Sequence, residues 1–275
     1  MNKLTAKIGF VGAGNMANAL LQGLLKNKQA PSTLFVYDLN SKKMKTLTNL
    51  GIRSCKNPAE LLSKSEIIIL ATKPQDLKLA LTELKPHLQK HLVISIATGI
   101  DTATLAKFIP SSCKIIRSMP NNPALIGEGV TALYCAQKLQ SSEKAKVEKI
   151  FQGAGDFLWV KKEEQLDAVT GLSGSGPAYV YQFVEALTQA GVKQGLPEEI
   201  AYSLSLKTVL GSALTLLKTK EKPSTLIPLV TSKKGTTLAG LAVMKKGKFN
   251  QLIAQTVKAA TQRAKEIRNE LKKGS

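Results

Sequence analysis

The feature that most constrains this chain is a short glycine motif near its first residue. Gly12-Ala13-Gly14-Asn15-Met16-Ala17 fits the pattern G-x-G-x-x-A, between the β-rich run Lys7 to Gly12 and an apolar helical pattern from Met16 to Leu25. In such a turn the first glycine permits the bend, the second admits a pyrophosphate, and a small third residue lets helix and strand pack closely. The motif therefore predicts a dinucleotide-binding β-α unit. The alternative is an ordinary glycine-rich turn in a fold that binds no nucleotide.

Strand-like and helix-like segments alternate along the first part of the chain. The expected strands are residues 7–12, 34–37, 67–72, 92–97, 114–119, 129–135 and 157–160, and the expected helices between them are residues 16–25, 41–50, 76–84, 101–108 and 142–151. The run Ile67 to Thr72 is almost wholly apolar, as burial on both faces of a sheet requires. This alternation predicts an α/β Rossmann-type domain, doubly wound around a parallel sheet, over residues 1–163.

After about Glu163 the strand-like runs disappear and helical periodicity takes over. Gly176-Pro177 is expected to open a long helix that ends near Lys193, because proline in the first turn of a helix loses no hydrogen bond. Further helices are expected over residues 196–218, 224–229, 236–246 and 250–271. The sequence therefore predicts a second, all-α C-terminal domain over residues 164–275.

The chain is strongly basic, with a formal net charge of +20 at pH 7. The excess is spread over both predicted domains, at +12 for residues 1–163 and +8 for residues 164–275. Arginine, the side chain that phosphate and base readers favour, occurs only at Arg53, Arg117, Arg263 and Arg268, and aromatic residues for base stacking make up only 5%. We therefore expect a solvated lysine-rich surface, nonspecific attraction to polyanions at low salt, and no nucleic-acid partner.

Three observations favour a cytoplasmic location. The cysteines, Cys55, Cys113 and Cys135, are odd in number and have no histidines at ligand spacing, so neither a disulfide framework nor a metal site is expected. The first apolar stretch is part of the predicted fold, which argues against a secretory leader. The longest apolar runs, such as Ile67 to Ala71, are far shorter than the ~20 residues of a membrane helix, so no membrane partner is expected.

The end of the second expected strand bears on the choice of nicotinamide cofactor. Asp38 lies there, and a carboxylate at this place hydrogen-bonds a ribose 2′-hydroxyl and repels a 2′-phosphate, which favours NADH. Ser41, Lys42 and Lys43 follow closely and together can hold a phosphate. Alternatively, Asp38 merely caps the next helix. The sequence therefore predicts NADPH or NADH and leaves the choice open.

Two later loops belong to the same cleft, because ligands of open α/β sheets lie beyond the carboxyl ends of the strands. Ala71-Thr72-Lys73-Pro74 follows one buried strand, and Ile96-Ala97-Thr98-Gly99 follows the next. Pro74 fixes a bend at the end of its strand, and the small residues of the second loop let a dinucleotide lie flat. Lys73 is expected to contact the cofactor through its backbone, or to be solvated, rather than to act as a catalytic lysine.

Taken together, these segments resemble those of the pyrroline-5-carboxylate reductase family, which catalyses the last step of proline biosynthesis. The resemblance spans nearly the whole chain, at Phe10 to Ala17, Thr72 to Gln75, Arg117 to Asn121, Gly171 to Tyr179 and Thr231 to Thr237. The first two segments are shared by many reductases. The segment Gly171 to Tyr179 and the Ser-x-x-Gly-Thr-Thr pattern that ends at Thr237 are much more specific.

The resemblance implies NAD(P)H-dependent reduction of the cyclic imine 1-pyrroline-5-carboxylate to L-proline. It also implies that the helical domain is a dimerisation domain that interlocks two subunits and holds the substrate facing the nicotinamide, and that dimers can assemble into decamers. By the same resemblance, Asn57 contacts the adenosine end of the cofactor. The predicted cofactor-binding residues are Val11, Gly12, Ala13, Gly14, Asn15, Met16, Asp38, Asn57, Ala71, Thr72, Lys73, Pro74, Ile96, Ala97 and Thr98.

The residue types present suit the chemistry of an imine. The two histidines, His87 and His91, lie in a lysine-rich stretch before a strand, so the imidazole that hydride transfer to a ketone needs is missing. A protonated imine is already an electrophile. Its site must mainly position the ring, hold the carboxylate and meet the nitrogen with one hydrogen bond.

The start of the helix expected from residue 236 offers free amides and hydroxyls that suit a carboxylate. We assign substrate binding to Ser232, Gly235, Thr236 and Thr237, and we assign the Thr237 hydroxyl to the imine nitrogen as the catalytic group. The alternative is simple helix capping by Thr236 or Ser232. Lys233-Lys234 stands where the family usually has proline and glycine, which either changes the path of this loop or adds two ammonium groups that attract an anionic substrate.

Two other functions remain open from the sequence. A related two-domain 3-hydroxyacid or β-keto-acid dehydrogenase needs a lysine in its long interdomain helix for proton transfer. The helix from Pro177 to Lys193 has no interior lysine, and Lys207 in the next helix has a different setting. A non-catalytic nucleotide-sensing protein would use the cleft to regulate assembly.

Overall fold

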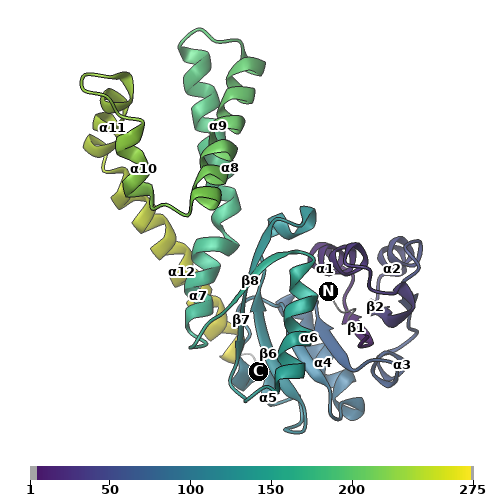
Figure 1. Cartoon of the computed structure of the whole chain (residues 1–275). Coiled ribbons are helices and arrows are strands. Elements are labelled where there is room, and N and C mark those ends of the chain that lie inside the picture. Colours follow the sequence, from purple (N-terminus) through teal and green to yellow (C-terminus); the bar gives the residue numbers. More distant parts are fainter. Residues whose placement is uncertain (1–4, 274–275) are drawn as a thin grey trace. The chain divides into compact units, whose positions relative to one another are not determined.

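The computed structural model describes residues 5–273 and divides into two compact units (Figure 1). The first unit contains the chain up to Ser175 together with the residues from Ala259 onward. The second unit is Gly176–Lys258. The last helix therefore begins in the second unit and ends in the first.

The described residues of the first unit form one eight-stranded sheet with the strand order β3-β2-β1-β4-β5-β6-β7-β8. The strands are β1 Ile8–Val11, β2 Leu34–Tyr37, β3 Arg53–Ser54, β4 Ile67–Leu70, β5 Leu92–Ser95, β6 Lys114–Met119, β7 Gly129–Cys135 and β8 Gly155–Trp159. The order reverses beside β1, because β2 and β4 pair on its two sides, both parallel to it. The carboxyl end of β1 is thus the place where an open α/β sheet binds its ligand.

The prediction of a parallel sheet is wrong at its last two strands. β7 pairs antiparallel with β6 and β8 pairs parallel with β7, so both run opposite to the first six strands. Only residues 120–128, which include the short 3₁₀ helix Asn122–Ile126, join β6 to β7. A parallel crossover needs a dozen or more residues, so this short connection can only turn the chain back on itself.

Helices cover both faces of the sheet, so the predicted doubly wound Rossmann-type architecture is confirmed. They are α1 Asn15–Lys26, α2 Ser41–Thr48, α3 Pro58–Ser63, α4 Pro74–Leu84, α5 Thr102–Ala106, α6 Ser141–Gln152 and α7 Gln165–Val169, and a π-helical turn, Thr170–Gly174, follows α7. The sequence analysis did not predict β3, α3, α7 or the π-helical turn. Segments of two to six residues are too short to show a clear hydrophobic period.

Two hydrophobic cores lie on opposite faces of the sheet. Ile8, Phe10 and Ile69 point into one core, where they join apolar residues of α1 and α6. Ile68 and Leu70 point into the other, with apolar residues of α3, α4 and α5. Successive strand residues thus serve opposite cores, which explains why β4 is apolar at every position.

The second unit is helical, as predicted. It comprises α8 Gly176–Lys193, α9 Glu198–Thr219, α10 Pro223–Leu229, α11 Thr236–Lys246 and the first part of α12 Phe249–Lys273. Helices α8 and α9 pair closely, and Gly191 packs against Ala201. Neither α10 nor α11 has a buried residue in the part of the chain that the structure describes.

Helix α9 leaves much of its apolar surface exposed. Its exposed apolar residues are Ile200, Tyr202, Leu204, Leu206, Leu210, Leu214 and Leu217. It is also the one helix of residues 5–273 that is long and apolar enough to cross a membrane by length and composition, with a mean hydropathy of 1.4 over an 18-residue window of which 11% is buried. A single such helix is weak evidence for a membrane span, because a helix that meets a second protein chain has the same composition.

A close backbone contact sets the position of α1 on the sheet. A Cβ atom on Gly23 of α1 would lie 2.6 Å from the carbonyl carbon of Gly153 and 2.7 Å from its oxygen. No side chain at position 23 fits unless one of the two backbones moves. Because α1 begins at the glycine turn, this contact also positions the turn.

We expect Gly23→Ala to lower the free energy of unfolding by ~1–3 kcal/mol, because the added methyl group overpacks a backbone contact. Urea unfolding followed by circular dichroism measures the change. Gln22→Ala, at an exposed position of the same helix, is the matched control and should stay within ~0.5 kcal/mol of the parent. Equal stability of the Gly23→Ala variant and the parent would contradict the close contact.

Candidate active site

The turn between β1 and α1 requires glycine at its first position. Gly12 has a φ of +102°, and its amide donates to the Tyr37 carbonyl at 2.8 Å. A Cβ atom there would lie 2.7 Å from the carbonyl oxygen of Ala71. The backbone conformation and the close approach of β4 each exclude a side chain, so the turn stays tight.

Gly14 leaves space in front of α1. It is the N-cap residue of the helix, no side chain caps the terminus within the described residues, and a Cβ atom on Gly14 would meet nothing within 4 Å. The first amides of α1 are therefore available, and the positive end of the helix dipole faces this space. This is the arrangement that binds a phosphate group.

Asp38 at the end of β2 is bound to the glycine turn. Its Oδ2 accepts from the Ala13 amide at 2.7 Å, and its Oδ1 accepts from the Asn40 amide at 2.7 Å. The alternative that Asp38 caps the next helix is wrong, because the Asn40 side chain caps α2 by accepting from the amides of Lys42 and Lys43. Asp38 therefore fixes the glycine turn against the end of β2.

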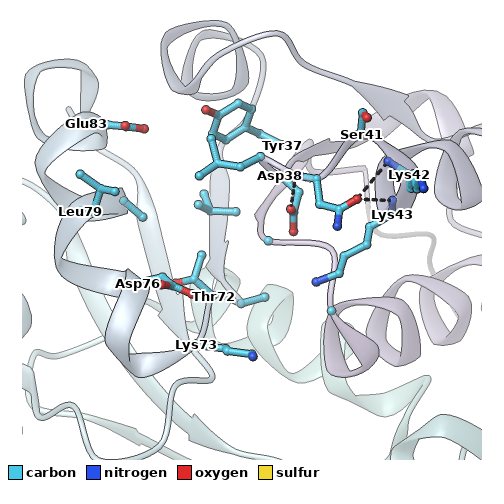
Figure 2. Close-up of a pocket in the computed structure, with 17 residues that line it drawn as sticks. Tyr37, Asp38, Ser41, Lys42, Lys43, Thr72, Lys73, Asp76, Leu79 and Glu83 are labelled. Carbon is cyan, nitrogen blue, oxygen red and sulfur yellow. Dashed lines mark hydrogen bonds between the residues drawn. The ribbon is translucent and has the colours of Figure 1, made fainter.

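A cavity of about 760 Å³ opens at the carboxyl ends of β1, β2 and β4 (Figure 2). Of the predicted cofactor residues, it is lined by Val11, Gly12, Gly14, Asp38, Ala71, Thr72 and Lys73. Ser41, Lys42 and Lys43, the phosphate-binding candidates, line it as well. The structure thus brings three separate segments of the sequence into one cavity.

The residues around this cavity fit a dinucleotide. The Thr72 hydroxyl is buried and has no hydrogen-bond partner within the described residues, although it lies in the cavity wall. A buried hydroxyl without a partner is costly, and a polar ligand group would satisfy it. The open space before Gly14 suits a pyrophosphate, and Ser41, Lys42 and Lys43 offer donors at the side of β2.

Other predicted cofactor residues lie outside the lining of this cavity. They are Ala13, Asn15, Met16, Asn57, Pro74, Ile96, Ala97 and Thr98. Asn57 is exposed and caps α3, where its Oδ1 accepts from the Glu60 amide at 2.8 Å. Ile96, Ala97 and Thr98 directly follow β5, and the Thr98 hydroxyl lies 3.9 Å from the Met119 sulfur. Their roles toward the cofactor remain predictions.

The sequence analysis did not predict that α4 forms one wall of the cavity. Asp76, Leu79, Ala80 and Glu83 line it from α4 at positions i, i+3, i+4 and i+7. This spacing marks one helix face. Leu79 is 60% exposed and the face mixes charged with apolar residues, so the face shows no hydrophobic period.

Tyr37 lines the same cavity from the end of β2. Burial raises the pKa of its hydroxyl, and the carboxylates of Glu83 and Asp38 raise it further.

The predicted substrate segment lies between α10 and α11 in the second unit. Gly235 is the N-cap residue of α11, and no described side chain caps the helix, so capping by Thr236 or Ser232 does not occur. Thr236 and Thr237 are exposed in the first turn. A Cβ atom on Gly235 would touch the Ser232 hydroxyl, the end of a side chain that can rotate away.

The segment forms a tight turn although Lys233 and Lys234 lie in it. Lys234 adopts a left-handed conformation with a φ of +60°, and the Gly235 amide donates to the Ser232 carbonyl at 3.0 Å. A left-handed residue other than glycine costs roughly 1 kcal/mol. The ammonium groups of Lys233 and Lys234 both stand on an exposed loop.

The histidines lie away from this cavity. His87 is exposed, and the His91 Nε2 lies 3.2 Å from the Leu62 carbonyl, at the amino end of β5. No group of three or more His, Cys, Asp or Glu side chains that could hold a metal ion occurs within residues 5–273.

Comparison with known proteins identifies both parts of the chain. The family described as pyrroline-5-carboxylate reductase dimerisation matches residues 163–267, and the family described as NADP oxidoreductase, coenzyme F420-dependent, matches residues 7–99. The pyrroline-5-carboxylate reductase of Pseudomonas aeruginosa is 35% identical over 97% of this chain and 98% of its own length. That of Synechocystis is 39% identical over 96% of this chain and 99% of its own length.

Solved structures agree with the sequence matches. A pyrroline-5-carboxylate reductase from Coxiella burnetii superposes with a TM-score of 0.91 at 34% identity, covering 96% of this chain and 98% of that one. The Plasmodium falciparum pyrroline carboxylate reductase with NADP bound gives a TM-score of 0.86 at 33% identity, covering 97% of this chain and all of that one. With its nucleotide cavity, its helical dimerisation domain and these full-length relatives, the chain belongs to the pyrroline-5-carboxylate reductase family, the NAD(P)H-dependent oxidoreductases of the final step of proline biosynthesis.

Proposed function

We propose that this chain reduces 1-pyrroline-5-carboxylate to L-proline with NADPH or NADH. The observation that carries the proposal is the nucleotide cavity at the glycine turn, in a chain that matches reductases of this name along their whole length. Residues 1–163 would act as the dinucleotide-binding domain and residues 164–275 as the dimerisation and substrate domain. The match of the dimerisation family to residues 163–267 supports this division.

The cofactor would lie along the carboxyl ends of β1, β4 and β5. Val11 to Met16 would hold the pyrophosphate through the free amides of α1, and Asp38 and Asn57 would meet the adenosine end. Ala71 to Pro74 and Ile96 to Thr98 would line the path toward the nicotinamide. When bound, the cofactor supplies a hydride to the imine carbon.

The substrate would be held by the segment Ser232 to Thr237. Its carboxylate suits the uncapped amides at the start of α11, and Lys233 and Lys234 add positive charge nearby. The Thr237 hydroxyl would meet the imine nitrogen. That nitrogen carries a proton when the carbon accepts the hydride, so the C=N bond becomes the C–N bond of the neutral amine of the proline ring.

The chain offers the hydrogen-bonding groups that an imine reductase needs. It lacks the interior helix lysine that a 3-hydroxyacid or β-keto-acid dehydrogenase needs. Helix α8 carries no lysine before its last residue, Lys193. The relatives reported above are reductases along their whole length, which disfavours a purely nucleotide-sensing protein. Purified protein should oxidise NADPH or NADH, followed at 340 nm, when racemic pyrroline-5-carboxylate is added. Oxidation with a β-keto acid but not with the imine would contradict the proposal, as would binding without turnover.

The exposed apolar surface of α9 is best covered by a second copy of this chain. A contiguous apolar surface of this kind on a folded chain marks an interaction site. We propose a homodimer as the basic unit, with the decamer as its higher assembly, working in the cytoplasm with a small-molecule substrate. The three free cysteines suit a reducing compartment, and Cys55 and Cys113 are buried.

The cavity favours NADPH over NADH. Both Asp38 oxygens already accept amide hydrogen bonds, so fewer of their lone pairs are free to accept from a ribose 2′-hydroxyl. Figure 2 shows the Lys43 side chain extending from the start of α2 into the cavity. An ammonium group there would attract a 2′-phosphate and would gain little from a 2′-hydroxyl.

We expect Thr237→Ala to lower kcat about 100-fold, because it removes the hydrogen bond to the imine nitrogen. The dissociation constant of the cofactor, measured by fluorescence titration, should stay unchanged. Thr219→Ala removes an exposed hydroxyl at the end of α9, outside the segment, and is the control. Unchanged kinetics of the Thr237→Ala variant would remove Thr237 from the mechanism.

We expect Lys43→Gln to weaken NADPH binding about tenfold and to leave NADH binding almost unchanged, because only NADPH carries the 2′-phosphate. Asp38→Ser should shift the preference further toward NADPH. Lys45→Gln lies on the same helix but outside the cavity lining, and it should change neither constant. Equal effects of Lys43→Gln on the two dissociation constants would show that Lys43 does not bind the 2′-phosphate of NADPH.

We expect Leu210→Glu to dissociate the assembly, because it places a charge on the exposed apolar surface of α9. Light scattering after size exclusion should give at least twice the chain mass of 29.5 kDa for the parent protein and a smaller assembly for the variant. Leu50→Glu, an exposed leucine of the first unit, is the control. A monomeric parent protein would contradict the proposed dimer.

A further inference from the structure

The last turns of α12 pack against the loop that follows β5. Gly99 in this loop has a φ of +79°, and a Cβ atom there would lie 2.7 Å from Ile267 and 3.3 Å from Leu271. Both partners belong to α12, within the first compact unit. The loop begins with Ile96 to Thr98, the residues proposed above to line the path of the cofactor.

Two ion pairs fasten α12 to the first unit beside this loop. The Lys272 ammonium lies 2.6 Å from the Asp101 carboxylate at the loop's end, and the Arg268 guanidinium lies 3.1 Å from the Asp167 carboxylate of α7. Asp101 and Asp167 are both buried, at 4% and 2% exposure. Since a buried charge without a counter-charge is strongly unfavourable, the two cations from α12 offset part of the cost of burying these carboxylates.

Two carboxylates, Asp101 and Glu163, hold the end of the loop at residues 101 and 102. The second Asp101 oxygen accepts from the Thr104 amide at 2.8 Å and so caps α5. Glu163 accepts from the amide and the hydroxyl of Thr102, both at 2.7 Å, and pairs with the Arg117 guanidinium at 2.9 Å. Residues 101 and 102 are thus tied to β6, to the segment before α7 and to α12.

The loop is also held by burial of Ala97 and Ile100 in the core and by two hydrogen bonds near its start. The Ile96 amide donates to the Leu70 carbonyl at 3.1 Å, and the Ala97 amide lies 3.3 Å from the Ser95 hydroxyl. Beyond that point the contacts of Gly99 with α12 and the ion pair of Asp101 fix the backbone. The end of α12 therefore helps to fix the backbone at Gly99 and Asp101.

We propose that Arg268 and Lys272 are positioning residues for the cofactor, which act by fixing the loop 96–101 where it receives the nicotinamide half of the dinucleotide. This inference rests on the proposed function. The adenosine half belongs over β2, where Asp38, Ser41 and Lys43 line the cavity, so α12 acts on one half of the ligand only.

Binding of the whole cofactor and of its adenosine half separates this role from general destabilisation. In Lys272→Met and Arg268→Met, the dissociation constant of NADP⁺ should rise about tenfold, whereas that of adenosine 2′,5′-bisphosphate should change less than twofold. Arg268→Lys, which keeps the charge, should recover part of the loss. Arg263→Met is the control, because Arg263 pairs only with Glu266 and Glu270 on the exposed side of α12 in the described contacts.

Hydrogen exchange of the free protein tests the same inference without a ligand. The amides of residues 96–102 should exchange at least several-fold faster in Lys272→Met than in Arg263→Met, while the amides of β1 stay protected. Equal weakening of NADP⁺ and of the bisphosphate, or unchanged exchange in the loop, would overturn the proposal. If the parent protein bound no dinucleotide, the proposed function would fail, and the exchange rates would still decide whether α12 fixes the loop.

Discussion

The close approach of β1, β4 and α1 at Gly12 is the constraint on which the rest of the site depends. At this point a turn of the backbone lies so near the Ala71 carbonyl that no side chain fits. The turn directs the free amides of α1 toward open space, and Asp38 ties it to the end of β2. The phosphate site is therefore built from backbone atoms, with one carboxylate that holds them in place.

The two units of the chain are stabilised in different ways. The first has a hydrophobic core on each face of its sheet. The second has few buried residues and a long apolar helix surface in the single chain. A unit of this kind suits association with a second chain, in keeping with its match to a dimerisation family.

The return of α12 to the first unit links chain topology to chemistry. A helix that begins in the dimerisation unit ends against the loop after β5, held there by buried carboxylates and by apolar contacts with Gly99. Ion pairs of this kind add little net stability, because desolvation of the charges offsets their attraction. Placed beside the loop, they suit the role of holding it in one position.

The sequence by itself determined the glycine turn, seven of the eight strands, the change to an all-helical second part and the family, because these are written in local periodicity, turn residues and contiguous motifs. Only the tertiary structure decided that β7 runs antiparallel, that Asn40 rather than Asp38 caps α2, and that one face of α4 closes the cavity. It also brought Arg268 and Lys272 to carboxylates about a hundred residues or more earlier in the chain. These features depend on contacts between distant segments, which leave no period and no spacing in the sequence.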